Sequence, residues 1–334
     1  MTISRQSVGK GARVPRRSAA LVAAAVFSVA VLAGGTSACT AGATGAAPVT
    51  SVATPVATPT PVPVPAEKYQ TPGDYAEFIE VDGFERWFLV HIPPGYRPGV
   101  QMPLVVNLHG AGGDAFSQQK VSGMNAKADE AGFIVVHPQA MGEKPVWYGP
   151  LPGLPGQPDR DFFEALLAHL QREISVDPAR IYATGISNGG TMANGLGCYM
   201  SETFAAIAPV SGGHTAFWEC EVSRPVSVLV IHGTSDQVIP YHGRGDEVPP
   251  VREWVEAWAE RNGCDAEPVV AYPYTDKVET WEHCDEGVVV TLHTREGGGH
   301  VWPGSELGEM FEGASSTMDA TDVIWAFFEA HPRP

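Results

Sequence analysis

Residues 180–190 read RIYATGISNGG, in which Gly185, Ser187 and Gly189 have the spacing G-x-S-x-G directly after a short β-branched run. A serine hydroxyl is a poor nucleophile unless the backbone presents it sharply to a base, and glycines on either side make room for such a turn. The same spacing arises by chance in glycine-rich chains, and this chain has 37 glycines. The stretch therefore predicts a strand-to-helix turn with Ser187 as candidate nucleophile, whose partners must come from elsewhere in the chain.

Apolar strands and helical segments alternate on both sides of this turn. We expect strands at residues 76–81, 86–93, 102–110, 132–139, 180–185, 204–212, 226–233 and 287–294, and helices at 159–174, 188–200, 251–263 and 320–330. Buried apolar strands that alternate with helices specify an α/β fold, a mostly parallel sheet with helices on both faces. Such sheets bind their ligands at the carboxyl ends of the strands.

Two further candidate residues follow strands of this predicted sheet. Asp236 ends the stretch VLVIHGTSD, and His300 ends VVVTLHTREGGGH. An activated serine needs an imidazole to accept its proton and a carboxylate to hold that imidazole in the right tautomer. The order Ser187, Asp236, His300 is that of the α/β-hydrolase fold, which we therefore expect. Asp246 is the alternative acid.

The turn HGAGG at residues 109–113 also follows a strand. A tetrahedral intermediate needs two N–H donors for its oxyanion. We expect the backbone N–H groups of Asn188 and Ala111 to supply them, because glycines in the turn let its backbone approach the substrate. His109 is interpreted as structural, since the base follows the acid in this fold. A phosphate-binding loop is excluded because the turn has no lysine.

The N-terminal segment has the composition of a leader and a tether. Basic residues precede the apolar run of residues 19–33, and the small-residue stretch GGTSAC follows it. We expect a signal peptide of the lipoprotein type at residues 1–38 with lipidation of Cys39, and an ordinary secretory signal is the alternative. Residues 39–66 are rich in Pro, Thr, Ala and Val and predict an extended tether before a folded domain at 67–334.

The charge of the chain limits its partners. Its net charge is −17 at pH 7, and the predicted leader holds basic residues but no acidic ones, so the exported part is more acidic still. Nucleic acid and anionic lipid surfaces are polyanions that such a chain repels, so both are poor partners, and we expect no nucleic-acid ligand.

Four cysteines follow Cys39, namely Cys198, Cys220, Cys264 and Cys284. An even number in an exported chain predicts two disulfides. Among the three pairings, we favour Cys198–Cys220 with Cys264–Cys284 because each closes a short loop. The sequence has no close C-x-x-C pair, so we expect no metal site.

Several motifs together resemble one esterase family. They are NLHGAGGD, RIYATGISNGG, FAAIAPVSG, HGTSDQVIPY, WVEAWAERNGC and EGGGHVWPG. As a set they are similar to the secreted esterases grouped with polyhydroxybutyrate depolymerases, feruloyl esterases and acetylxylan esterases, from about Phe78 to the C-terminus. Among bacterial lipoproteins the chain is similar to the actinobacterial LpqC type. Ala111 stands where depolymerases often carry cysteine.

The resemblance implies a role for each candidate residue. It makes Ser187 the nucleophile, Asp236 the acid, His300 the base and Ala111 the second oxyanion donor. It also implies the disulfide Cys198–Cys220, which many relatives share.

The expected function is that of a secreted or cell-surface serine esterase, without cofactor, acting on short or aromatic acyl esters of plant cell-wall carbohydrate. We expect Trp302, Trp147 and Tyr148 to stack on the substrate, because aromatic faces suit sugar rings and phenolic acids. The expected partners are an ester substrate, including polymeric carbohydrate or polyester, and a membrane reached through the lipid anchor. Polyhydroxyalkanoate depolymerisation, peptide cleavage and non-catalytic polymer binding are the alternatives.

Overall fold

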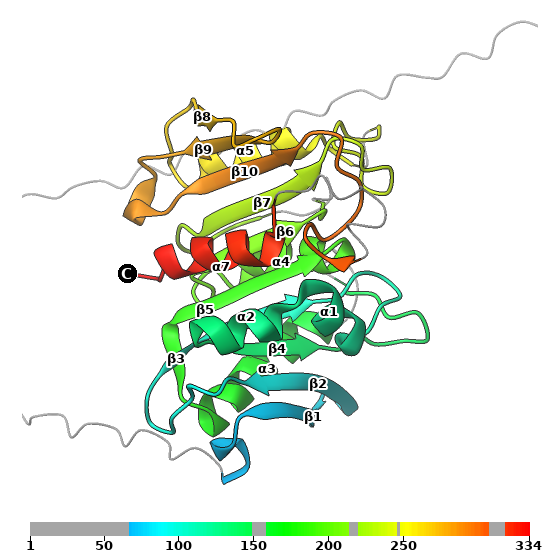
Figure 1. Cartoon of the computed structure of the whole chain (residues 1–334), viewed down its shortest axis with the longest axis vertical. Helices are drawn as coiled ribbons and strands as arrows, with labels where there is room; N and C mark the ends of the chain where they lie inside the picture. Colours follow the sequence, from blue (N-terminus) through cyan, green and yellow to red (C-terminus); the bar gives the residue numbers. More distant parts are fainter. Residues whose placement is uncertain (1–66, 149–157, 214–219, 246–247, 307–317) are drawn as a thin grey trace, which may run out of the picture. The chain divides into compact units, whose positions relative to one another are not determined.

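Six neighbouring strands run parallel through the centre of one sheet (Figure 1). The computed structural model describes residues 67–334 apart from 149–157, 214–219, 246–247 and 307–317. The predicted leader and tether, including Cys39, and the alternative acid Asp246 lie outside the described residues.

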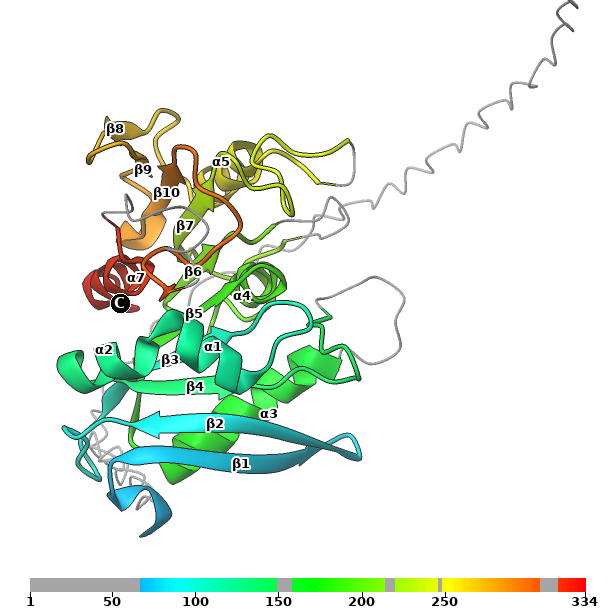
Figure 2. The ribbon, with the colours of Figure 1, turned by 45° about the vertical axis from the view of Figure 1, so that its right-hand side comes forward.

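The described strands form a single sheet in the order β1-β2-β4-β3-β5-β6-β7-β10-β9-β8. Their bounds are β1 Gly73–Val81, β2 Phe84–Ile92, β3 Met102–Leu108, β4 Ile134–Pro138, β5 Val176–Ile186, β6 Ala206–Val210, β7 Ser227–Gly233, β8 Val269–Ala271, β9 Lys277–Trp281 and β10 Val290–Arg295. The antiparallel pairs β1–β2 and β8–β9 close its two edges (Figures 1 and 2).

Helices cover both faces of the sheet. They are α1 Ala115–Ser122, α2 Met124–Ala131, α3 Pro158–Glu173, α4 Asn188–Tyr199, α5 Val251–Arg261 and α7 Ala320–Ala330, with 3-10 turns at Glu67–Gln70 and Asp285–Gly287. Helices α1, α2 and α7 lie on one face, and α3, α4 and α5 on the other (Figure 1). No helix of the described part is long and apolar enough to cross a membrane.

Alternate side chains of the central strands enter two separate cores. In β3, Leu104 and Val106 pack in the core that contains α3, α4 and α5, whereas Val105 packs in the core that contains α2 and α7. Because both faces are buried, these strands read as continuous apolar runs in the sequence. The predicted mostly parallel, two-faced α/β sheet is confirmed.

Four elements were not expected from the sequence. Helices α1 and α2 are short and mostly polar, so they lack the apolar period that predicts a helix. A capping box between Asp114 and Ser117 begins α1 instead. Strands β8 and β9 are short, and β8 is exposed throughout.

Both predicted disulfides are confirmed. Cys198 in α4 is bonded to Cys220, and Cys264, just after α5, is bonded to Cys284. Disulfides of this kind form and persist in oxidising compartments, which agrees with an extracellular protein.

Candidate active site

The turn after β5 holds Ser187 in a strained backbone conformation. Its φ is 58° and its ψ is −123°, which a residue with a side chain rarely adopts. The turn presses against the end of β3: a Cβ added to Gly185 or Gly189 would lie 2.6 or 2.3 Å from the carbonyl oxygen of Leu108. The glycines of the G-x-S-x-G spacing are therefore a steric requirement, and they leave Ser187 partly exposed at the start of α4.

The loop after β7 brings Asp236 to the loop after β10. Oδ2 of Asp236 lies 2.7 Å from Nδ1 of His300. Oδ1 of the same carboxylate accepts hydrogen bonds from the backbone N–H groups of Val238 and Ile239, each at 2.9 Å. Asp236 is buried, whereas the His300 side chain keeps 19% of its surface exposed. The acid is thus fixed in the protein while the imidazole reaches the surface.

Backbone hydrogen bonds join these two loops to each other. Thr234 N donates to Arg295 O, and Ser235 N donates to Gly298 O, each at 2.9 Å. At Gly233 a Cβ would lie 2.1 Å from the oxygen of Gly298. The glycine run before His300 therefore packs directly on the end of β7, which sets the imidazole over the carboxylate.

A second histidine, which the sequence analysis missed, also contacts the acid. Nε2 of His232 lies 2.8 Å from Ile239 O and 3.3 Å from Oδ2 of Asp236. Burial by itself raises the pKa of the Asp236 carboxyl, but hydrogen bonds from His232 and His300 outweigh it and hold that pKa well below its usual range. Asp236 is therefore a carboxylate at any ordinary pH. Only the spacing of four residues between His232 and Asp236 hinted at this contact.

The glycine-rich turn after β3 is held by His109, as expected. Its Nδ1–H donates to Gly110 O at 2.8 Å, and its Nε2 accepts from Ala140 N at 3.1 Å, which fixes the tautomer. Burial lowers the pKa of His109, so the ring stays neutral. The glycine-rich turn lies beside the Ser187 turn, since a Cβ added to Gly110 would be 3.4 Å from the Cβ of Ser187.

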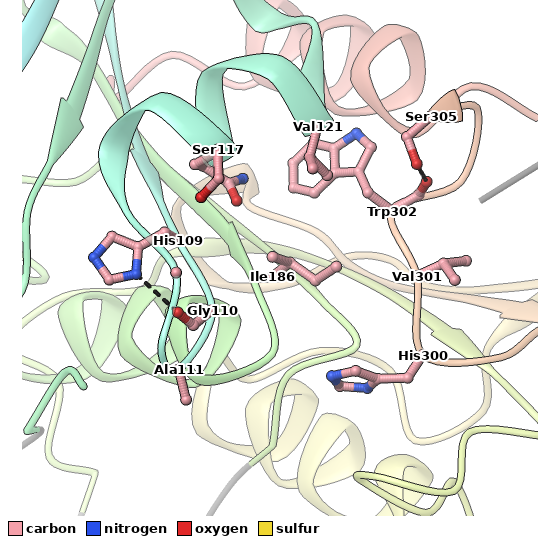
Figure 3. A pocket seen from close by; sticks show the side chains of 12 residues that line it. His109, Gly110, Ala111, Ser117, Val121, Ile186, His300, Val301, Trp302 and Ser305 are labelled. Carbon is pink, nitrogen blue, oxygen red and sulfur yellow. Dashed lines mark hydrogen bonds between the residues drawn. The ribbon is translucent and has the colours of Figure 1, made fainter. Parts of the chain in front are cut away.

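A pocket of about 230 Å³ opens between these loops (Figure 3). Ala111 and His300 lie across it from each other, and Ile186, directly before Ser187, lies between them. Helix α1 adds Ser117 and Val121 to its wall, and neither was expected because the helix itself was not. The candidate base, the oxyanion turn and Ile186, the residue directly before the candidate nucleophile, thus line one cavity at the carboxyl edge of the sheet.

Two of the three expected substrate-stacking residues need correction. Trp147 is 3% exposed, and its indole N–H donates to His109 O at 2.9 Å. Trp302 touches the pocket but is 1% exposed, and its indole N–H donates to Oγ1 of Thr321 at 3.0 Å. Side chains buried to this extent offer no free ring face to a sugar, and their N–H groups take internal partners instead. Tyr148 is exposed, and its stacking role stays a prediction.

The order of the strands, the strained turn at Ser187 and the Asp236–His300 pair define the class of this protein, the α/β-hydrolase fold. Residues 87–239 match the family model described as Esterase PHB depolymerase. The chain is 33% identical over 259 residues to NocK of Nocardia uniformis subsp. tsuyamanensis, a protein named as an esterase, covering 69% of this chain and 74% of that one. The chain belongs to this family of esterases related to polyhydroxybutyrate depolymerases.

Other relatives share the name esterase. Feruloyl esterase B of Piromyces equi is 31% identical over 242 residues, which cover 67% of this chain. The chain spans 44% of the length of that relative. Among solved structures, the acetyl xylan esterase from Aspergillus awamori is similar in fold, with a TM-score of 0.57 and 14% identity, covering 76% of this chain and 99% of that one.

Proposed function

We propose that the chain hydrolyses carboxylic esters with Ser187 as nucleophile, His300 as general base and acid, and Asp236 as the carboxylate that orients His300. The observation that carries this proposal is the 2.7 Å contact between Asp236 Oδ2 and His300 Nδ1 at the pocket beside the strained Ser187 turn. Membership of the esterase family supports it.

The first half of the reaction transfers the acyl group to the enzyme. His300 Nε2 takes the proton of the Ser187 hydroxyl as Oγ bonds to the ester carbonyl carbon. The carbonyl oxygen becomes an oxyanion, and the backbone N–H groups of Asn188 and Ala111 stabilise it. The carbon–oxygen bond to the alcohol then breaks, and His300 returns the proton to the leaving alkoxide.

The second half releases the acid. Water gives a proton to His300 while its oxygen bonds to the acyl carbon, and the oxyanion forms at the same two N–H groups. Its collapse breaks the bond to Ser187 Oγ, which recovers the proton from His300. Asp236 stays ionised throughout and stabilises the imidazolium, a role that the lowered pKa of its carboxyl supports.

The pocket favours a small acyl group. Its volume of about 230 Å³ is below the roughly 300–1,000 Å³ of ordinary ligand sites, and Val121, Ile186 and Val301 give it an apolar wall. The relatives are named feruloyl and acetylxylan esterases, which supports short or aromatic acyl esters of carbohydrate as the substrate class.

A substrate panel tests this function. The purified protein should hydrolyse p-nitrophenyl acetate, methyl ferulate and acetylated xylan faster than p-nitrophenyl dodecanoate. Fastest turnover of the dodecanoate would contradict the assigned acyl class, and binding of xylan without turnover of any ester would contradict catalysis. The family description makes polyhydroxybutyrate the second candidate substrate, so hydroxybutyrate oligomers complete the panel. A peptide p-nitroanilide distinguishes an esterase from a peptidase.

We also propose that Cys39 carries a lipid that anchors the protein at the outer face of a bacterial membrane. The order of basic, apolar and small residues before Cys39 supports this proposal. Cys39→Ala should move the protein from the membrane fraction to the medium. Unchanged fractionation would contradict lipidation and leave an ordinary secretory signal.

A further inference from the structure

One short segment, residues 145–148, connects the two turns that carry the proposed oxyanion donors. On the nucleophile side, the backbone N–H of Trp147 donates to Asn188 Oδ1 at 2.7 Å. The side-chain amide of Asn188 returns a hydrogen bond to the carbonyl oxygen of Trp147 at 3.1 Å. The residue directly after Ser187 is thus paired with Trp147 through two hydrogen bonds.

The same segment holds the glycine-rich turn. Trp147 donates its indole N–H to His109 O at 2.9 Å, and Gly112 N donates to Pro145 O at 2.7 Å. The Trp147 ring also packs on the His109 ring, with centroids 5.0 Å apart. Ala111 lies between His109 and Gly112, so both flanks of this proposed donor are fixed to one segment.

Side chains of α3 and β2 hold this segment in place. Tyr148 N donates to Oδ2 of Asp159 in α3 at 2.7 Å. Oδ1 of Asp159 pairs with Nη2 of Arg86 in β2 at 2.8 Å, and both side chains are almost fully buried. The Trp147 ring packs on Phe163 of α3, with centroids 5.5 Å apart. The segment is therefore a fixed brace.

We propose that Trp147 is a positioning residue that sets the separation of the two oxyanion donors, the N–H groups of Asn188 and Ala111. The inference rests on the proposed function. Donors stabilise an oxyanion only where they are pre-aligned on the position it will occupy, within about half an ångström. The indole N–H of Trp147 binds the glycine-rich turn that contains Ala111, and the backbone of Trp147 binds the side chain of Asn188. One residue therefore couples the two donor turns.

This role predicts a particular kinetic effect. Trp147 is buried and does not line the pocket, so its loss should leave substrate binding largely unchanged. The two donors act on the oxyanion, which exists only along the reaction path. Loss of the brace should therefore lower kcat and leave KM within about twofold. We expect a ten- to hundredfold loss, because removal of an entire donor costs about 10²–10³ in kcat.

The test compares Trp147→Phe with a matched control. Trp147→Phe keeps an aromatic ring and removes the hydrogen bond to His109 O. Trp258→Phe makes the same change at a buried tryptophan whose indole N–H donates to Asn194 Oδ1 at 2.7 Å. Asn188→Ala is a second variant that breaks the other connection and keeps the backbone donor.

Two measurements on the full-length protein separate positioning from stability. The first is kcat and KM for p-nitrophenyl acetate. The second is the inhibition constant of a trifluoromethyl ketone, because addition of Ser187 Oγ to its carbonyl carbon sends a proton to His300 and leaves an oxyanion on the ketone oxygen. The ketone thus reports the oxyanion site directly.

The inference requires Trp147→Phe and Asn188→Ala to lower kcat and to weaken ketone binding by similar factors, with Trp258→Phe near wild type. Unchanged ketone binding would overturn it. Equal losses in Trp147→Phe and Trp258→Phe, in parallel with their melting temperatures, would make Trp147 purely structural. If Trp147→Phe does not fold, Asn188→Ala decides by the same criteria. Absence of ester turnover in the wild type would instead refute the proposed function, and this inference with it.

Discussion

Oδ2 of Asp236 and Nδ1 of His300 lie 2.7 Å apart although 64 residues separate them in the chain. The other carboxylate oxygen is held by two backbone N–H groups, so the carboxylate cannot turn away from the imidazole. This arrangement fixes Nδ1 of His300 as a donor and leaves Nε2 to accept a proton from Ser187 in the proposed reaction.

Asp236→Asn should lower kcat on p-nitrophenyl acetate by about 10⁴ and leave the fold intact. The amide is nearly isosteric with the carboxylate but can hold His300 in the wrong tautomer and cannot stabilise an imidazolium. Asp276→Asn is the matched control, because Asp276 Oδ2 contacts His293 Nε2 at 3.0 Å in a second buried pair outside the pocket. Equal activity of the two variants would contradict the role of Asp236.

Gly189→Ala should abolish activity and reduce the yield of folded protein. The Cβ added to Gly189 would lie 2.3 Å from Leu108 O and 2.5 Å from His109 O, so either the Ser187 turn or the end of β3 must move. Gly95→Ala is the control, because its Cβ would make only an ordinary contact, 3.7 Å from the Met102 side chain. Esterase assays and circular dichroism distinguish the two variants. A fully active Gly189→Ala protein would be incompatible with the close packing of the Ser187 turn on the end of β3.

Trp302→Ala should act through stability. The Trp302 indole donates to Thr321 Oγ1, whose hydroxyl donates to Ser122 O, so it joins the base loop to α7 and α1. Loss of this buried side chain should lower the free energy of unfolding by about 3–5 kcal/mol. Activity on methyl ferulate and on p-nitrophenyl acetate should fall by the same factor; a selective rise in KM for the ferulate would restore the stacking role.

Acid should destabilise the protein partly through His137. Burial, and to a lesser extent the nearby His91, lowers the pKa of His137 to about 3. The unfolded chain binds a proton here below about pH 6.5. Between pH 6.5 and 3 the unfolded state therefore holds more protons at this site, and the free energy of unfolding falls as pH falls.

His137→Gln should accordingly flatten the pH dependence of unfolding by up to about 1.4 kcal/mol per pH unit in this window. Urea unfolding at several pH values measures the slope. His283→Gln is the control, because the hydrogen bond with Asp265 raises the pKa of this exposed histidine. His283 is therefore protonated in both states below about pH 6.5, and its replacement should keep the wild-type slope in this window. Identical slopes for His137→Gln and the wild type would mean that His137 does not resist protonation.

The sequence predicted the central strands well because both of their faces are buried, as Leu104, Val105 and Val106 illustrate. The Ser187 turn was also predictable, because the glycines that its close approach to the end of β3 requires stand at a recognisable spacing around the serine. Helix α1 was not, because its start depends on the cap at Asp114 and its interior is largely polar. The pocket wall that α1 contributes was missed for that reason.

Trp147 and Trp302 show that the position of a residue after a strand does not predict which atoms its side chain contacts. Both residues follow strands whose ends lie at the site. The Trp147 indole N–H nevertheless donates to His109 O, 38 residues away, and the Trp302 indole N–H donates to Oγ1 of Thr321. Such partners depend on how distant loops pack, which no local pattern encodes. The contact of His232 with Asp236 likewise depends on the turn between them rather than on the four-residue spacing alone.

The role of Ser187 as nucleophile is tested by kcat/KM of Ser187→Ala on p-nitrophenyl acetate, measured beside the wild type at equal folded concentration. Loss of a triad serine removes the covalent step, so we expect a fall of about 10⁴ or more with unchanged circular dichroism and thermal unfolding. Retention of more than about a tenth of the wild-type value would correspond to less than about 1.4 kcal/mol of barrier and would contradict the assignment of Ser187 as the nucleophile.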